Sequence, residues 1–332
     1  MEKCNGRDNN RLPLYKVVPL IVPFSVGLAV SDFCNFRCVY CKHSTILEKS
    51  QNDRMLSWDE FVNMANEVES LCIRGGQKVK VVTICGTGEP LTHKMLPQMI
   101  RYIKEHNWAE RIELTTNGSL LTHDLSDQLV EAGLTRLIVS VQGINTKTYR
   151  DVCGYDIDYP RFINELEYFY THKKKCFVYI KTVDIALKKG EQGKFYDMFS
   201  PFADMVNIES VIDVFDDVDY SKITVTDNKS RYGYTYDERK CCHDIFMRLH
   251  IETDGSVGVC SCKNPALHIG NINKQRLIDI WNGDLHRKYM KLHLMGRKNE
   301  IPRCASCDAF AKTGHPLDNL DQHADEILQR LV

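Results

Sequence analysis

The sequence predicts an α/β fold built on a parallel sheet, and two observations carry this prediction. Between residues 27 and 212, six short runs rich in β-branched residues alternate with amphipathic helical segments. Repeating strand–helix units form parallel sheets with right-handed crossovers. Six units are too few for an eight-stranded barrel, so we expect a partial (β/α)6 barrel of the TIM type. A cysteine-rich stretch beyond residue 240 indicates a second, smaller domain.

The six expected strands are short apolar runs. The run VKVVTIC at 79–85 is apolar enough to be covered on both faces, as strands of parallel sheets are. The expected strands cover residues 27–32, 79–85, 111–116, 136–141, 177–185 and 205–210.

Helices are expected between these strands, and the first has the clearest start. Ser57 followed by Glu60 forms a capping box, in which each side chain bonds the backbone N–H of the other residue. Gly133 ends a later helix, as a residue that tolerates a left-handed backbone does. The expected helices cover 58–71, 95–106, 123–133, 161–173 and 194–202.

Changes in composition divide the rest of the chain. Residues 1–26 form an N-terminal extension, 27–212 the barrel, and 213–240 an acidic, tyrosine-rich linker. Residues 241–312 are the cysteine-rich domain, with turns expected at 254–255 and 282–283 and one helix across 277–293. Residues 313–332 are expected to end in an amphipathic helix.

Charge and hydropathy exclude some partners. The formal net charge is −1, so there is no electrostatic reason to expect nucleic acid or an anionic membrane surface. The apolar run at 17–30 is interrupted by Pro19 and Pro23 and is too short to span a bilayer. No signal-peptide cleavage site follows it. We therefore expect a cytoplasmic protein that binds neither nucleic acid nor membrane.

The chain has 14 cysteines, and most of them fall in two groups. In a cytoplasmic protein, this usage indicates metal binding or catalysis rather than disulfides. The first group is Cys34, Cys38 and Cys41, directly after the first expected strand. The second group is Cys241, Cys242, Cys260, Cys262, Cys304 and Cys307.

The first group lies where barrels of this type carry their active sites, at the carboxyl end of a strand. Three thiolates on one tight loop suit a [4Fe–4S] cluster whose fourth iron is left for substrate or cofactor. A closed structural site would use four protein ligands. The alternatives are a zinc site with a distant fourth ligand, and buried thiols without metal.

The C-x₃-C-x₂-C spacing, with Tyr40 before the last cysteine, resembles the radical S-adenosylmethionine (SAM) superfamily. Residues 85–90, CGTGEP, resemble its GGEP motif, with a cysteine before the first glycine and Thr87 at the second. TTNG at 115–118 and SVQG at 140–143 resemble the segments with which that superfamily contacts SAM. The resemblance implies that these residues bind SAM: Tyr40, Gly86, Gly88, Glu89, Thr116, Asn117, Ser140 and Gln142.

The resemblance also implies the chemistry. SAM chelates the open iron, and one electron from the reduced cluster cleaves the C5′–S bond of SAM. The resulting 5′-deoxyadenosyl radical takes a hydrogen atom from the substrate. The implied partners are a substrate and an electron donor such as flavodoxin or ferredoxin.

Four cysteines of the second group resemble the auxiliary-cluster extension called SPASM, or its shorter twitch form. These are Cys242, Cys260, Cys304 and Cys307. No cysteine follows Cys307, so the resemblance implies a single auxiliary [4Fe–4S] cluster. A four-cysteine zinc site is the alternative, and Cys241 or Cys262 can replace its neighbour as a ligand.

Within the superfamily, the expected activity is that of an oxidoreductase or an epimerase. A thiol at Cys262 or Cys241 could return a hydrogen atom in an epimerase, although inert thiols remain the alternative. Lys181, Asp184 and Glu209 lie on or beside the last two expected strands and are candidates for hydroxyl binding or deprotonation.

The substrate is expected to be a small polar molecule, a sugar or an aminocyclitol. A peptide or protein side chain is the alternative, as for peptide maturases and sulfatase-maturing enzymes. About 26 residues precede the first expected strand, and this favours the small molecule. Molybdenum-cofactor cyclases share the N-terminal pattern, but their three-cysteine set and Gly-Gly tail differ from this chain. A non-enzymatic iron–sulfur carrier would not need the SAM-contact motifs.

Overall fold

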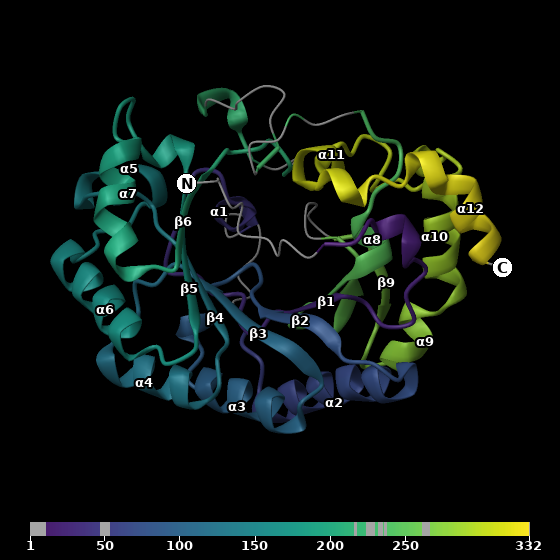
Figure 1. Cartoon of the computed structure of the whole chain (residues 1–332), viewed down its shortest axis with the longest axis horizontal. Helices are drawn as coiled ribbons and strands as arrows, with labels where there is room; N and C mark the ends of the chain where they lie inside the picture. Colours follow the sequence, from purple (N-terminus) through teal and green to yellow (C-terminus); the bar gives the residue numbers. More distant parts are fainter. Residues whose placement is uncertain are drawn as a thin grey trace.

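The computed structural model describes residues 11–46, 54–215, 218–223, 230–231, 235, 238–260 and 266–331. Within them, nine strands form one sheet in the order β6-β5-β4-β3-β2-β1-β7-β8-β9. The sheet curves around an interior, and helices lie along its outer side (Figure 1).

Strands β1 to β6 pair side by side and in parallel, which confirms the predicted partial barrel. Their bounds are β1 Ser25–Leu28, β2 Val79–Ile84, β3 Ala109–Thr116, β4 Arg136–Ser140, β5 Phe177–Val183 and β6 Met205–Glu209. β1 ends four residues before the predicted end. There the chain turns to pair with residues 54–56, since Leu56 donates its N–H to Val30 and Asp32 donates to Arg54.

The helices that follow these strands are α2 Trp58–Gly75, α3 Leu96–His106, α4 His123–Glu131, α6 Tyr159–His172 and α7 Gln192–Phe199. The capping box between Ser57 and Glu60 is present at the start of α2. Within residues 27–212, two α-helices of the described part of the chain were not predicted, α1 Lys42–Ile46 and α5 Thr146–Cys153. Both are short, so their apolar period is hard to recognise.

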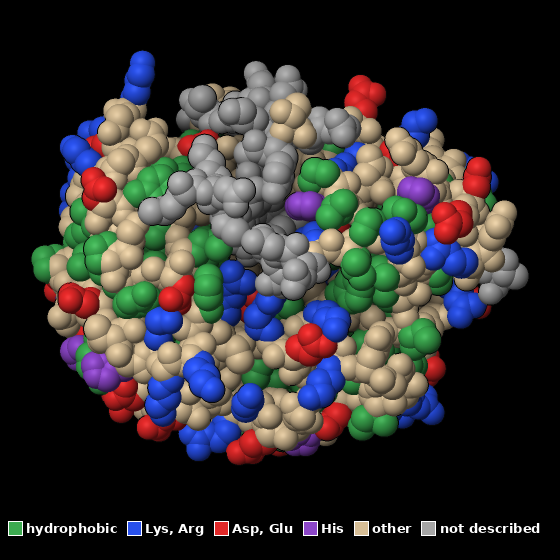
Figure 2. Space-filling view, viewed as in Figure 1, with side chains coloured by type: hydrophobic (Ala, Val, Ile, Leu, Met, Phe, Trp, Pro, Cys, Tyr) green, Lys and Arg blue, Asp and Glu red, His purple; other side chains and the backbone are tan. Residues whose placement is uncertain are grey.

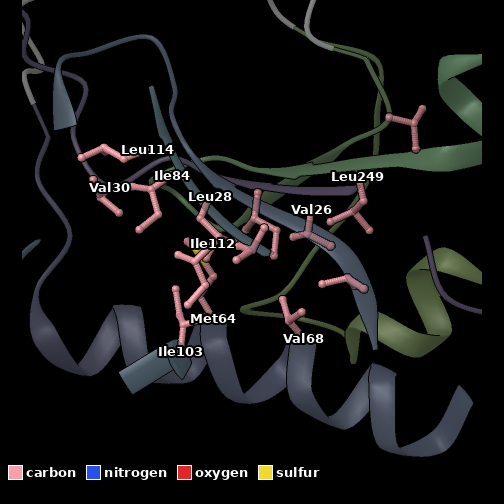
Figure 3. Close-up of a cluster of buried hydrophobic side chains, with 14 of the residues drawn as sticks. Val26, Leu28, Val30, Met64, Val68, Ile84, Ile103, Ile112, Leu114 and Leu249 are labelled. Atoms are coloured by element: carbon pink, nitrogen blue, oxygen red, sulfur yellow. The ribbon is translucent and has the colours of Figure 1, made fainter. Parts of the chain in front are cut away.

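One part of the core lies between the sheet and α2 (Figure 3). Met64 and Val68 of α2 face Val26 and Leu28 of β1, and all four side chains are almost completely buried. Because β1 lies near the middle of the sheet, this core fixes the strand that leads into the first cysteine group.

The cysteine-rich region adds its strands to the same sheet. β7 Arg248–Ile251 pairs in parallel with β1, and β8 Ser256–Gly258 and β9 His268–Asn271 continue antiparallel. Gly255 has φ +81° in the turn between β7 and β8, a left-handed backbone that favours glycine. The predicted domain boundaries stay a prediction, although the strand pairing is continuous across them.

The C-terminal helices are α8 Asp244–Met247, α9 Leu277–Trp281, α10 Asp284–Leu294, α11 Ala309–Thr313 and α12 Ala324–Arg330. The prediction of one helix across 277–293 is wrong, because the chain breaks between α9 and α10. Gly283 has an extended backbone there, and a Cβ at this position would lie 2.4 Å from the carbonyl oxygen of Asp279.

The surface carries charges of both signs. On the face in Figure 2, Lys and Arg side chains alternate with Asp and Glu over the lower half. Among the described residues, no helix is long and apolar enough to cross a membrane.

Candidate active site and cysteine-rich cavity

The loop with Cys34, Cys38 and Cys41 follows β1 and is held by the end of α5. Arg37 donates its backbone N–H to Cys153, and Val39 donates to Val152. Within the loop, Cys41 donates its N–H to Cys38, at 3.0 Å. The three sulfur-bearing residues are thus held in one tight turn by backbone bonds, as a cluster that takes three ligands from one loop requires.

The surroundings of these thiols disfavour free thiolates. Burial raises the pKa of Cys34 to about 12 and that of Cys41 to about 11. A hydrogen bond to Cys153, together with burial, raises the pKa of Cys38 well above its usual value. Because thiolates are the metal-binding form, a bound cation has to supply the positive charge that stabilises them. Three sulfurs in a partly buried loop fit the three-ligand iron–sulfur site.

Both glycines of the CGTGEP segment pack tightly against the chain that enters this loop. A Cβ at Gly86 would lie 2.9 Å from the Cβ of Ala29. At Gly88 it would lie 2.4 Å from the carbonyl oxygens of Ser31 and Phe33. A side chain at Gly88 would therefore push the loop outward, so the motif positions the loop whether or not it also contacts SAM.

Glu89 joins the ends of β2 and β3. Its buried carboxylate accepts bonds from the backbone N–H groups of Leu91 and Asn117 and from the hydroxyl of Thr116. Burial raises the pKa of Glu89, while these three donors act in the opposite direction. The Nδ2 group of Asn117 donates to Asn35 in the cysteine loop, at 2.9 Å. These predicted SAM-binding residues are bonded to one another and brace the loop.

The other predicted SAM-binding residues line a cavity at the carboxyl ends of β4, β5 and β6. Tyr40 donates its hydroxyl to Oε1 of Gln142, at 2.5 Å. Gln142 in turn donates to the carbonyl oxygen of Ser140. The cavity contains about 640 Å³ of space between atoms, part of it open to solvent, and is lined by Tyr40, Cys41, Ser140, Val141, Gln142, Lys181, Thr182, Val183, Glu209, Ser210, Val211, Ile212, Phe215 and Arg231.

Two of the three charged candidates on the last strands line this cavity. Lys181 of β5 and Glu209 of β6 form an ion pair, with 2.9 Å between Nζ and Oε2. The Glu209 carboxylate is almost completely buried. Asp184 is not among the lining residues, and its carboxylate accepts the N–H groups of Ile185 and Val211. Asp184 thus holds the chain beyond β6 in place.

The second cysteine group surrounds a separate cavity of about 440 Å³ between atoms. Its lining includes the four predicted ligands and excludes Cys241, whose N–H donates to Asp321. Cys262 lies outside the described residues. The full lining is Cys242, Asp244, Ile245, Cys260, Leu267, His293, Arg303, Cys304, Cys307, Ala309 and Phe310.

Four thiols suit either a zinc ion or an iron–sulfur cluster. Among the described residues, no three His, Cys, Asp or Glu side chains lie close enough to share one metal ion. A zinc ion holds its sulfurs at about 2.3 Å from one centre. The four cysteines line one space, and four thiolates are also the ligand set of a [4Fe–4S] cluster, so the donor set fits an iron–sulfur cluster.

Lys298 holds the turn that carries the last two cysteines. Its Nζ donates to the carbonyl oxygens of Cys304 at 3.0 Å, Ala305 at 3.1 Å and Cys307 at 2.9 Å. Sequence analysis missed this lysine, along with Arg231 in the first cavity and His293 in the second. None of them stands in a recognisable motif, so only the fold identifies them.

Two family models match the chain. The model of the radical SAM superfamily matches residues 28–186, and the model of an iron–sulfur cluster-binding domain, SPASM, matches residues 241–308. These two domains imply SAM and [4Fe–4S] clusters as cofactors.

Curated relatives match over a part of their length. GTP 3′,8-cyclase of Desulforamulus reducens is 33% identical over 125 residues, 38% of this chain and 36% of that protein. GTP 3′,8-cyclase of Staphylococcus haemolyticus is 30% identical over 213 residues, 61% of this chain and 58% of that protein. The chain thus spans less than two thirds of either relative.

Solved structures share the fold over most of the chain. Streptococcus suis SuiB bound to S-adenosylmethionine has a TM-score of 0.65 at 15% identity, covering 92% of this chain and 76% of SuiB. BtrN in complex with AdoMet and 2-DOIA has a TM-score of 0.55 at 19% identity, covering 86% and 93%. The solved structures show the shared fold alone, whereas the two family models show that the chain carries a radical SAM domain followed by a C-terminal SPASM domain.

Proposed function

We propose that this radical SAM enzyme acts on a small polar molecule, a sugar or an aminocyclitol, and oxidises or epimerises one of its alcohol carbons. The observation that carries the proposal is a single cavity. Its lining joins Tyr40 and Gln142, from the segments that resemble SAM-binding motifs, to Lys181 and Glu209. Cofactor and substrate groups would therefore meet in one space.

The cofactors define the reaction class. When bound, the iron–sulfur cluster and SAM supply a 5′-deoxyadenosyl radical that removes a hydrogen atom from the substrate. The residues of the chain have to place one carbon of the substrate beside this radical and keep water away.

The cavity wall supplies the polar groups for this task. The Lys181–Glu209 pair offers the N–H groups of Lys181 that Glu209 does not accept, together with a carboxylate acceptor, and these match hydroxyl and amino groups on a small ring. The Glu209 carboxylate is also placed to accept a hydroxyl proton when an alcohol is oxidised.

The second cavity supports oxidation. With four cysteines, its donor set resembles a closed site that exchanges electrons rather than one that binds substrate. We further propose a flavodoxin or ferredoxin as the reductant. Cys262 stays a candidate hydrogen-atom donor for epimerisation, while Cys241 is buried and lines neither cavity.

The test is a substrate screen with anaerobically reconstituted enzyme. Aminocyclitols, hexoses and short peptides are compared by 5′-deoxyadenosine formed above the basal level. An aminocyclitol or hexose that stimulates the reaction and is converted supports the proposal. Stimulation by peptides alone would assign the enzyme to the maturases, as would be consistent with the SuiB structure bound to its precursor peptide SuiA. Deuterium from solvent in the product identifies an epimerase, and an oxidised product identifies a dehydrogenase.

Variants of the ion pair test the site itself. Glu209→Gln and Lys181→Met should each lower kcat/KM by about 10²-fold, the scale of a general base or a positioning group. Basal SAM cleavage should be retained. Lys147→Met is the matched control, because it removes an exposed ion pair with Asp151 on α5. Equal activity of the Glu209 and Lys147 variants would reject this substrate site.

A further inference from the structure

His293 is a buried histidine beside the second cysteine group. It lies near the end of α10, is 1% exposed, and lines the cavity with the four cysteines. Its Nδ1 accepts the backbone N–H of Cys242, at 3.2 Å. Its Nε2 is buried and has no hydrogen-bond partner among the described residues. A buried polar atom without a partner costs free energy, so its partner has to come from elsewhere.

The bond to Cys242 determines which nitrogen carries the proton. A neutral imidazole has one N–H and one acceptor nitrogen, and the hydrogen bond of one nitrogen sets the state of the other. Because Nδ1 accepts a bond, Nε2 carries the hydrogen. It can therefore donate a hydrogen bond, but it has no lone pair left to bind iron. His293 is thus excluded as a cluster ligand while Nδ1 keeps this bond.

We propose that His293 donates its Nε2–H to a sulfur of the auxiliary cluster and thereby raises the reduction potential of that cluster. The proposal rests on the assignment of the four cysteines to an auxiliary cluster, made above. Hydrogen bonds to the sulfurs are among the factors that set the potentials of iron–sulfur clusters. The reduced cluster carries more negative charge, so an N–H donor stabilises it more than the oxidised form.

Two substitutions separate the two nitrogens. In His293→Asn, the side-chain amide can take the place of Nδ1 and accept from Cys242, but nothing reaches the place of Nε2. In His293→Gln, the longer side chain reaches the place of Nε2 and supplies an N–H there, while the acceptor at Nδ1 is lost. Histidine at position 106 is exposed and lies on α3, so His106→Asn is the control for the substitution itself.

The measurement is a redox titration followed by electron paramagnetic resonance. It uses the full chain with Cys34→Ala, Cys38→Ala and Cys41→Ala, so that the auxiliary cluster alone gives a signal. Iron is counted first, and about four irons per chain are expected. Coupling of the reduced cluster to exchangeable protons is then compared in H₂O and D₂O.

The expected result is a lower potential in His293→Asn and loss of one exchangeable-proton coupling, with both properties retained in His293→Gln. A tenfold change in the one-electron equilibrium would appear as a shift of about 59 mV. His106→Asn should match the parent chain.

Three outcomes would overturn the proposal. If both His293 variants match the parent in potential and in proton coupling, Nε2 does not contact the cluster. If His293→Asn keeps its properties and His293→Gln loses iron, the histidine acts only through the backbone of Cys242. If the parent chain itself binds no iron, the cluster assignment fails as well, and the iron count distinguishes that result from the other two.

Discussion

The two cysteine sites of this protein are built in opposite ways. The first takes its three cysteines from eight consecutive residues after β1, and the backbone of α5 holds that loop. The second collects cysteines from positions 242, 260, 304 and 307, and Lys298 and His293 hold it from within the same region. The first adjoins a cavity open in part to solvent, while two of the four cysteines of the second are buried.

The difference fits the two tasks proposed above. A site that has to admit SAM and substrate needs an open side, so its ligands come from one edge. A site that only exchanges electrons gains from ligands on all sides, because the surrounding protein then fixes its geometry and its potential. The following predictions, from the largest expected effect to the smallest, test whether the two sites are separable in this way.

The largest effect is expected for Cys38→Ala. The variant should lose SAM cleavage by about a thousandfold or more, which corresponds to about 4 kcal/mol of activation free energy. Iron should fall from about eight to about four per chain, because the second site is independent. 5′-Deoxyadenosine and iron assays check this, with Cys72→Ala as a control that removes a buried thiol from α2. If both clusters disappear together, the sites are not separable.

Cys307→Ala should give the converse result. Iron should again fall to about four per chain, but SAM cleavage without substrate should persist, because the three-cysteine loop is intact. Conversion of substrate should be lost if the reaction needs the second site as an electron acceptor. Turnover at the parent rate would show that the auxiliary site is structural.

Lys298→Met should weaken the second site without abolishing it. Three carbonyl oxygens lose their donor, and hydrogen bonds from a charged group contribute about 1.5–3 kcal/mol. We expect partial loss of auxiliary iron and a Tm lower by several degrees. The first site should bind iron normally. Lys288→Met, an exposed change on the same helix as His293, provides the control; an equal Tm shift in both would remove the role given to Lys298.

The smallest effect concerns pH. Burial lowers the pKa of His286, although the nearby carbonyl oxygens of Trp281 and Ile245 act in the opposite direction. The unfolded chain therefore takes up a proton at this residue more readily than the folded chain does, and stability falls as the pH drops below about 6.5. Glu89, near the first site, has a raised pKa in the folded chain. Its contribution to the stability of the folded state therefore increases as the pH drops.

Thermal unfolding between pH 7 and pH 5 measures this slope. His286→Gln should flatten it, whereas Glu89→Gln should make it steeper, since the group that favours the folded state in acid is removed. A slope that stays the same in His286→Gln would show that this histidine keeps its usual pKa on folding.

The strands were predictable because each is a local apolar run. The sequence at 79–85 carries all the information needed for β2, and β3 to β6 are likewise recovered close to their predicted bounds. The position of β7 beside β1 was not predictable, because pairing between distant segments leaves no local pattern. Asn282-Gly283 was recognised as a turn, yet the helix was extended across it, since the apolar period continues on both sides.

The same contrast between local patterns and distant contacts applies to the candidate sites. The spacing of Cys34, Cys38 and Cys41 is local, and so the first loop could be predicted. The choice between Cys241 and Cys242 could not be settled by spacing, because their distances along the chain to every other cysteine differ by a single residue. Only the fold shows that Cys242 lines the cavity and that Cys241 does not. The placing of Glu89 toward Thr116 and Asn117 likewise depends on how β2 and β3 meet.

The position of β1 between β2 and β7 has a consequence for how the protein is made. Val26 pairs with Val82 on one side and with Leu249 on the other, so the second partner lies more than 200 residues further along the chain. Pairings between such distant segments form slowly, because a long loop has to close first. On the ribosome, one edge of β1 would expose unpaired N–H and C=O groups until the last third of the chain emerges. The strand that supports the radical site is therefore completed late, and chains stopped before β7 should be prone to aggregation.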